Sequence, residues 1–146
     1  MKVYFSPSED CRNAIIREIR NAKAMLKICV FTISDDRITD AILEAHQRSV
    51  AITIITDNDK TFDVGSDIEM LSKKGIRIKM DTTTNHMHHK FMVVDDRTVT
   101  TGSYNWTNSA ARYNQENIIV TADKAAVSAF SKEYDRLWPL MTDYVK

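Results

Sequence analysis

The chain has 146 residues, of which 43% are hydrophobic and 27% charged, and its 20 basic residues balance its 20 acidic residues. This length predicts a single domain, residues 1–146, with a core large enough to fold without disulfides or metal. Zero net charge excludes attachment to nucleic acid through overall charge alone, although a local basic groove would be compatible with it.

The first half of the chain alternates strands with helices. Ser8 can cap a first helix, and Ser34 or Asp35 can cap a second. Ser66 and Glu69 have the spacing of a capping box for a third helix, which Gly75 would end. Apolar runs between these helices predict strands. The predicted strands are residues 2–6, 26–33, 50–56 and 76–80.

The second half begins with a predicted hairpin, whose turn is Asp95-Asp96-Arg97. A polar loop at residues 102–115 follows, and a last helix starts near Asp123. The strands of this half are residues 90–94, 98–101 and 117–121. Together the elements predict an α/β fold, a three-layer α/β/α sandwich with a mixed, mostly parallel central sheet.

Neither cysteines nor long apolar segments indicate an exported or membrane protein. Cys11 and Cys29 lie in apolar patterns and are expected to be reduced core residues. Acidic residues precede any apolar run long enough for a signal peptide, and no stretch approaches the roughly 20 apolar residues of a membrane-spanning helix. The sequence therefore predicts a cytoplasmic location.

Three of the four histidines lie within four positions, in "HMHH" at residues 86–89. The period of a strand would put His86, His88 and Lys90 on one face. Two histidines could bind a metal, but an ammonium beside them would repel a cation, and no third carboxylate or thiolate is near in sequence. We therefore predict no metal and no cofactor, with plain surface or core-edge histidines as the alternative.

Residues farther along the chain complete a set suited to a phosphodiester. Lys90 and Asn105 can donate to the non-bridging oxygens, and Ser103 can add a third donor. A neutral nitrogen of His88 can attack phosphorus if a carboxylate such as Glu116 holds the other nitrogen as N–H. The lysine then supplies the positive charge that a metal usually provides.

"HHKFMVVD" followed by "GSYNWT" resembles the His-x-Lys-x(4)-Asp and Gly-Ser-x-x-Asn signature of the phospholipase D superfamily. The similarity covers nearly the whole chain and is closest to mitochondrial cardiolipin hydrolase or Zucchini-type nucleases and their bacterial relatives. It implies that His88 is a nucleophile that forms a phosphohistidine, and that Glu116 hydrogen-bonds this histidine. It also implies that Lys90, Ser103 and Asn105 bind phosphate.

Asp95 and Gly102 match motif positions for which the resemblance implies a structural role. Asp95 is expected to bond backbone amides in the hairpin. Only one such motif is present, whereas the superfamily builds one active site from two motifs. The resemblance therefore implies a homodimer with the active site on its two-fold axis. The cysteine-rich zinc-binding insertion and the membrane anchor of mitochondrial members are not seen, which weakens transfer of the mitochondrial role.

Four further side chains are candidates for a substrate groove: His86, Trp106, Arg112 and Lys60. Trp106 could stack on a base or headgroup, but packing is favoured because large aromatic residues are usually buried. For the other three the alternative is solvated surface. Asp57 and Asp59 follow a predicted strand, where α/β folds often place sites, and turn residues are the alternative there.

These observations predict a metal-independent phosphodiesterase, an endonuclease that cleaves single-stranded nucleic acid through a phosphohistidine at a site shared by two subunits. The alternative substrate is a membrane phospholipid, which would make the protein a phospholipase D or cardiolipin hydrolase. A third hypothesis is a nucleic-acid-binding module without turnover. The complete set of His, Lys, Ser, Asn and Glu argues against this module, because binding alone does not need a neutral nucleophile.

Overall fold

The computed structural model describes residues 1–61 and 63–144. Its strands are β1 (Lys2–Ser6), β2 (Met25–Val30), β3 (Ala51–Asp57), β4 (Arg77–Asp81), β5 (Lys90–Val94), β6 (Thr98–Gly102), β7 (Glu116–Thr121) and β8 (Thr142–Asp143). Its helices are α1 (Asp10–Asn21), α2 (Asp36–Gln47), α3 (Asn58–Thr61), α4 (Ile68–Lys73), α5 (Asn108–Arg112), α6 (Lys124–Leu137) and the 3₁₀ helix η1 (Trp138–Leu140).

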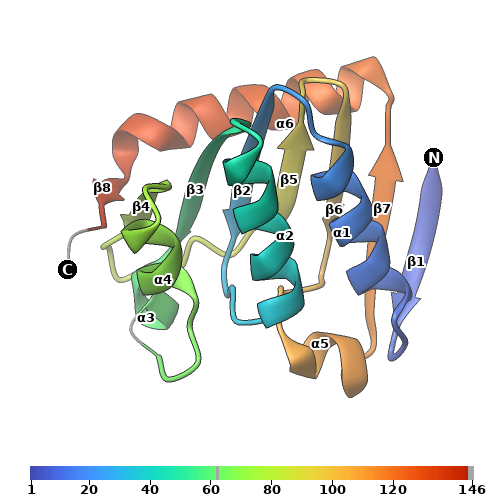
Figure 1. Ribbon diagram of the computed structural model, residues 1–146, viewed down its shortest axis with the longest axis horizontal. Coiled ribbons are helices and arrows are strands. Elements are labelled where there is room, and N and C mark those ends of the chain that lie inside the picture. Colours follow the sequence, from blue (N-terminus) through green and yellow to red (C-terminus); the bar gives the residue numbers. More distant parts are fainter. Residues whose placement is uncertain (62, 145–146) are drawn as a thin grey trace.

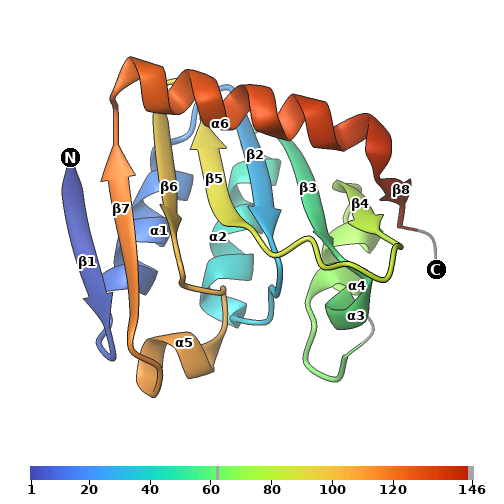
Figure 2. The ribbon, with the colours of Figure 1, turned by 180° about the vertical axis from the view of Figure 1, so that it is seen from behind.

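The helices form two layers around one sheet, as predicted. Figure 1 shows α1, α2 and α4 over one face, and Figure 2 shows α6 running across the other. The apolar faces of α1 and α2, which include the buried Ile15 and Ile42, pack in one core. Phe91 and Tyr134 belong to a second core between the sheet and α6. The α/β/α sandwich is therefore confirmed.

The sheet is mixed, as predicted, with the strand order β1-β7-β6-β5-β2-β3-β4-β8. Only the pairs β2–β3 and β3–β4 are parallel, however, and the other five pairs are antiparallel. "Mostly parallel" is therefore wrong for the strand pairs. The reason is that β5, β6 and β7 form a meander, and β1 pairs with β7 at the edge rather than with β2.

Local sequence signals account for several element ends, although neither α1 nor α4 has a side-chain cap. Asp35 caps α2 by accepting the N–H of Arg37. Asp95 and Asp96 have φ angles of 55° and 49°, the left-handed pair that a tight hairpin turn requires. The predicted loop at 102–115 contains the short helix α5, because Thr107 caps it by accepting the N–H of Ala110.

The topology brings the ends of the strands that carry the site residues to one end of the sheet. There β2, β3 and β6 finish while β5 and β7 begin, as the register places Lys90 opposite Val30 and Gly102 opposite Ile118 (Figures 1 and 2). The residues around the His-x-Lys and Gly-Ser segments are therefore brought to the same end.

Candidate active site

The histidine segment reaches the site as an extended stretch without regular structure, directly before β5. The rings of His86 and His88 lie 5.5 Å and 4.7 Å from the ring of Phe31, which follows β2. The N–H of Phe31 donates to the carbonyl of His89 at 2.9 Å. The His89 ring instead contacts Phe91, 5.4 Å away. The predicted alternation of faces is therefore confirmed.

Lys90 is in direct contact with His88. Its Nζ lies 2.7 Å from Nδ1 of the imidazole and 2.8 Å from the carbonyl oxygen of His88, to which it donates. The ammonium also lies 5.6 Å from the centre of the Phe31 ring. One cation and one imidazole are thus held together on the same side of the segment.

Partial desolvation and neighbouring charge favour the neutral form of His88, although its side chain is exposed. Desolvation lowers the pKa of His88, the positive charges of Lys90 and His86 lower it further, and the carboxylate of Asp57 opposes them. Desolvation also lowers the pKa of Lys90, whereas the charge of Glu116 raises it. A neutral imidazole beside an ammonium is what a nucleophile and a phosphate-binding cation require.

The start of β7 positions the Gly-Ser segment. The N–H of Ser103 donates to the carbonyl of Asn117 at 3.0 Å, and Ser103 Oγ accepts the N–H of Asn117 at 3.2 Å. A Cβ on Gly102 would lie 2.0 Å from the same Asn117 oxygen, so only glycine fits there. Asn105 accepts the N–H of Thr32 through Oδ1 at 3.3 Å, which leaves its NH₂ group as the donor.

Glu116 begins β7 at the same end of the sheet. Its Oε2 accepts from Nδ2 of Asn114 at 3.2 Å. Among residues 1–61 and 63–144, no hydrogen bond joins Glu116 to His88. The carboxylate acts on Lys90 through its charge, however, so it is close enough to influence the site.

Asp95 lies at the opposite end of the sheet, in the turn between β5 and β6. The prediction that Asp95 bonds backbone amides of the hairpin is wrong. Its carboxylate accepts the N–H groups of Lys23, Ala24 and Met25 at 2.9, 2.8 and 2.9 Å. Asp95 therefore ties the loop between α1 and β2 to the hairpin.

The groove candidates have different positions. Trp106 is 1% exposed, so the prediction that it lines a groove is wrong. The alternative prediction, packing in the core, is confirmed. Its N–H and carbonyl are bonded to the segment after β2, which holds it inside. Arg112 is exposed on α5. The side chain of Lys60 lies outside the described part of the chain.

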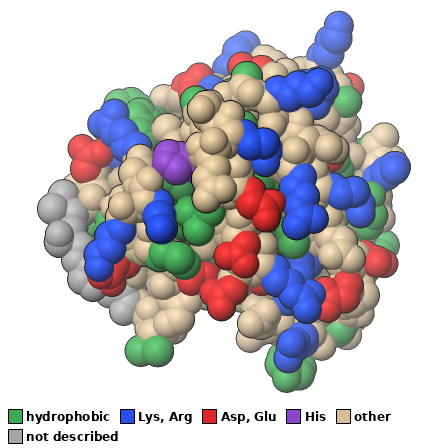
Figure 3. All heavy atoms as spheres, in the orientation of Figure 1, with side chains coloured by type: hydrophobic (Ala, Val, Ile, Leu, Met, Phe, Trp, Pro, Cys, Tyr) green, Lys and Arg blue, Asp and Glu red, His purple; other side chains and the backbone are tan. Residues whose placement is uncertain are grey.

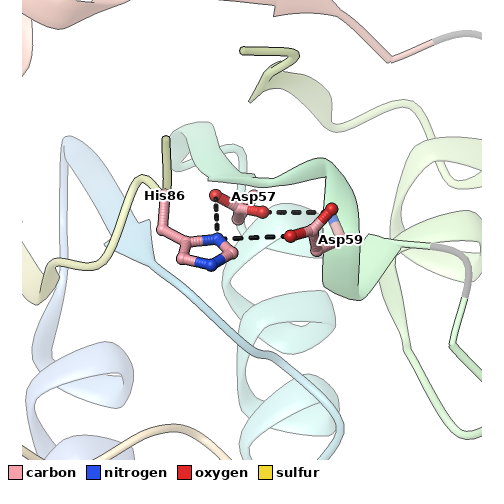
Figure 4. A group of neighbouring side chains, drawn as sticks. All are labelled: Asp57, Asp59 and His86. Carbon is pink, nitrogen blue, oxygen red and sulfur yellow. Dashed lines mark hydrogen bonds and ion pairs between the residues drawn. The ribbon is translucent and has the colours of Figure 1, made fainter. Parts of the chain in front are cut away.

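His86 meets two carboxylates at the end of β3 (Figure 4). Its Nδ1 lies 3.2 Å from Asp59 Oδ2 and 3.6 Å from Asp57 Oδ2. Sequence spacing did not show that carboxylates lie near His86, because they come from a distant strand. One ligand atom of each residue lies within 4.8 Å of the others. We assign them no ion, because their contacts with one another explain the grouping.

Comparison with known sequences gives curated relatives that share about two fifths of their residues with the chain. Mitochondrial cardiolipin hydrolase of Chlamydomonas reinhardtii is 42% identical over 120 residues, which are 82% of this chain and 54% of that protein. The protein of the same name from Homo sapiens is 38% identical over 130 residues, covering 89% of this chain and 52% of the human protein. The chain thus spans about half the length of the curated relatives it matches.

These names contradict the predicted cytoplasmic location, since the relatives are mitochondrial by name. That prediction depended on finding no targeting segment. Such an absence has no weight in a chain that spans about half of each relative. Among the described residues, no helix is both long and apolar enough to cross a bilayer.

Solved structures share the fold over the full chain. Nuc from Salmonella typhimurium, described as a phospholipase D family member, has a TM-score of 0.92 and 26% identity, and the match covers 99% of this chain and 97% of Nuc. NucT from Helicobacter pylori has a TM-score of 0.90 with 22% identity over 98% of each chain, which shows the shared fold.

The family model described as "Cardiolipin synthase, PLD-like domain" matches residues 15–138, which contain the histidine segment, both Gly-Ser contacts with β7, and Glu116. With the match to Nuc and the identity to the curated relatives, this match shows that the chain belongs to the phospholipase D-like family.

Proposed function

We propose that the protein is a metal-independent phosphodiesterase that cleaves single-stranded nucleic acid through a phosphohistidine, at a site shared by two subunits. One observation carries the proposal. The Lys90 ammonium is 2.7 Å from the imidazole of His88, at the end of the sheet that also presents Ser103 and Asn105. We take His88 as the nucleophile and Lys90, Ser103 and Asn105 as the groups that would bind phosphate at this end of the sheet.

The reaction has two displacements. In the first, a ring nitrogen of His88 forms a bond to phosphorus while the bond from phosphorus to the leaving oxygen breaks. Lys90, Ser103 and Asn105 donate to the non-bridging oxygens, whose negative charge grows in the transition state. In the second, water attacks the phosphohistidine, the N–P bond breaks, and the imidazole regains its lone pair.

The leaving oxygen needs a proton, and a histidine that is attacking phosphorus cannot supply it. One chain carries one His-x-Lys motif. We therefore assign the proton donor in the first step to His88 of the partner subunit. The same group then removes a proton from the attacking water in the second step. A two-fold axis through the site would bring the two imidazoles to opposite sides of the phosphate.

Single-stranded nucleic acid is favoured by exposed aromatic and basic side chains beside β7. Phe5 and Tyr113 are 63% and 74% exposed. Phe5 and Tyr113 are the sequence neighbours of Ser6 and Asn114, whose side-chain hydroxyl and backbone carbonyl are hydrogen-bonded, and the exposed Arg112 ends α5 directly before Tyr113. Single-strand-binding proteins use exposed aromatic rings to stack bases and basic groups to neutralise phosphate.

The face that carries α1 and α2 has acidic and basic side chains interspersed (Figure 3). It offers no continuous basic surface to a duplex. Because the chain has zero net charge, binding of nucleic acid would depend on local groups, and its salt dependence should be shallow.

A phospholipid is the second candidate substrate, and the names of the curated relatives favour it, because these are cardiolipin hydrolases. The chemistry at phosphorus would be the same. An alcohol would leave in place of a nucleotide hydroxyl.

The test is a side-by-side assay on labelled single-stranded RNA, single-stranded DNA, double-stranded DNA and cardiolipin vesicles, with His88→Asn as the matched control. The proposal predicts turnover of a single strand that His88→Asn loses. Turnover of cardiolipin alone would transfer the function to the lipid. Tight binding of oligonucleotides by both proteins without turnover of any substrate would identify a binding module.

A further inference from the structure

Asp57 is a fully buried carboxylate at the end of β3, 0% exposed. Its Oδ2 accepts the N–H of Met87 at 2.7 Å, and its Oδ1 accepts the N–H of Asp59 at 2.9 Å. Figure 4 shows it beside the His86 ring. A buried charge is costly unless it is hydrogen-bonded, so these contacts explain how it is tolerated and leave open what it does.

The N–H that Asp57 binds belongs to Met87, the residue directly before His88. Residues 85–89 have no partner strand, so this segment depends on separate contacts for its position. Several contacts hold it. Besides the bond to Asp57, Met87 Sδ lies 3.5 Å from Cys29 Sγ in the second core, and the N–H of Phe31 donates to the carbonyl of His89. Asp59 and Lys90 also contact the segment, but Asp57 is the charged partner that is fully buried.

We propose that Asp57 is a positioning residue for His88, which it serves by fixing the Met87 peptide and by facing the nucleophile with a buried negative charge. The inference rests on the proposed function of His88. It assigns to the end of β3 a role that neither the His-x-Lys motif nor the Gly-Ser segment contains.

The charges around His88 make this role measurable. Three positive or ionisable groups lower the pKa of His88: Lys90 on β5, and His86 and His89 in the histidine segment. Asp57, from β3, is the negative group that raises the pKa of His88. Loss of the carboxylate charge should therefore make the imidazole of His88 less basic.

Three variants separate position from charge. Asp57→Asn keeps an oxygen that can accept the Met87 N–H but removes the charge. Asp57→Ala removes both. Asp59→Asn is the matched control. Like Asp57, Asp59 contacts the His86 ring, but its side chain is 56% exposed and does not accept the Met87 N–H. If Asp57→Asn folds poorly, Asp57→Ser provides a smaller uncharged acceptor.

The first readout is the titration of His88 by NMR, with the His88 signal assigned from its loss in His88→Asn. All samples contain chelator, so that a cation cannot contribute. We expect Asp57→Asn to lower the pKa of His88 by about half a unit to one unit, and Asp59→Asn to leave it unchanged. This measurement needs no substrate, so it tests the inference even if no phosphodiester is turned over.

The second readout is turnover on the best substrate. Asp57→Asn should move the acidic limb of kcat/KM to lower pH, following the NMR titration. Asp57→Ala should lower kcat about 10- to 100-fold with little change in KM, because a nucleophile displaced by a fraction of an ångström loses its line of attack. A merely structural Asp57 would lower the thermal midpoint of its variants, with the His88 titration and kcat per folded molecule unchanged. That result would overturn the inference.

Discussion

The Nζ atom of Lys90 lies 2.7 Å from Nδ1 of His88, in a contact that joins the two motif residues two positions apart. Through this contact the ammonium occupies the lone pair of one ring nitrogen and lowers the pKa of the ring. In the proposed mechanism, a phosphate that binds the ammonium would compete with the imidazole for it. Substrate binding and release of the nucleophile would then be coupled, because the same cation would serve both.

The first prediction is that turnover requires His88 and Lys90 and no divalent metal. His88→Asn should lower kcat by at least about 1,000-fold, because it removes the atom that attacks phosphorus. Lys90→Gln should have a comparable effect. Excess EDTA should leave the wild-type rate unchanged in the same assay.

Circular dichroism and the thermal midpoint provide the control for these variants, since both should match the wild type. A rate lost in EDTA and restored by one specific cation would contradict the lysine-for-metal mechanism. It would direct attention to Asp57, Asp59 and His86, whose ligand atoms lie within 4.8 Å of one another.

The second prediction is a bell-shaped pH profile with both limbs displaced downward. His88 must be neutral to attack, so kcat/KM falls below its pKa, and desolvation with the Lys90 charge lowers that pKa from the usual 6.5. The proposed proton donor, His88 of the partner subunit, must be protonated, so kcat/KM also falls as pH rises above the pKa of that imidazole. Lys90 must be charged, and desolvation lowers its pKa from 10.5, so any activity that remains is lost at higher pH. Glu116 raises the pKa of Lys90, and Glu116→Gln should therefore lower the pH of this last loss. An acidic limb above 6.5 would be inconsistent with this site.

The third prediction concerns Asp95, which supports the fold at the far end of the sheet. Burial raises the pKa of its carboxyl, but three amide donors and Arg97 outweigh burial, so the pKa lies below 3.8. The stability from these bonds is present above the unfolded value of 3.8 and is lost as pH falls through the lower folded value. Asp95→Ala should lower the free energy of unfolding by about 1–3 kcal/mol at neutral pH.

Urea unfolding at pH 7 and at pH 3 measures this effect. The difference between Asp95→Ala and wild type should shrink at the lower pH. Turnover per folded molecule should stay near the wild-type rate, because Asp95 lies at the opposite end of the sheet from His88. A large loss of kcat with unchanged stability would give Asp95 a direct part in the reaction.

The fourth prediction is that Gly102 maintains the close contact of β6 with β7. Because a Cβ there would meet the carbonyl oxygen of Asn117 at 2.0 Å, Gly102→Ala must push the strands apart. We expect a loss of about 1–3 kcal/mol in the free energy of unfolding, together with lower turnover because Ser103 shifts. Ser103→Ala is the comparator, since it removes the proposed phosphate donor and the acceptor for the Asn117 N–H without a clash. It should lower kcat, with a smaller loss of thermal midpoint than Gly102→Ala.

Local sequence patterns predicted the layers of the fold and the contacts between residues close in sequence, because these features depend on short-range periodicity. The alternation His86, His88 on one face and His89 on the other was visible in the sequence, and the structure confirms it through Phe31 and Phe91. The pairing of β1 with β7 was not visible, since the two strands come from opposite ends of the chain. The sheet is mixed as predicted, but this pairing and the β5–β6–β7 meander make most strand pairs antiparallel.

Long-range polar contacts were equally hidden. The Asp57 carboxylate reaches the Met87 N–H from a strand far upstream, and nothing in the spacing of the two residues indicates it. The partners of Asp95 were misassigned for the same reason, because the amides of Lys23 and Ala24 come near only after α1 and the hairpin have packed. Sequence motifs identify the chemical groups, whereas the topology decides which groups meet.

The last prediction is the shared active site. The proposed mechanism uses one imidazole to attack and another to protonate the leaving oxygen, and one chain has a single His-x-Lys motif. A two-fold axis at the end of the sheet would supply the second. Analytical ultracentrifugation should therefore give twice the mass of the 16.7 kDa chain. The interface would present the same patch from both subunits.

A mixing experiment tests whether both histidines serve one site. Wild type and His88→Asn are unfolded together in equal amounts and refolded, so that subunits pair at random. About a quarter of the dimers are then wild type, about half are mixed and about a quarter are double mutant. If each site needs both imidazoles, mixed dimers are nearly inactive, and total activity falls to about a quarter of an all-wild-type sample. Activity near one half would mean that each chain works alone. The proton donor would then have to come from the same chain. His86 would be the candidate, because its ring contacts the same Phe31 ring as His88.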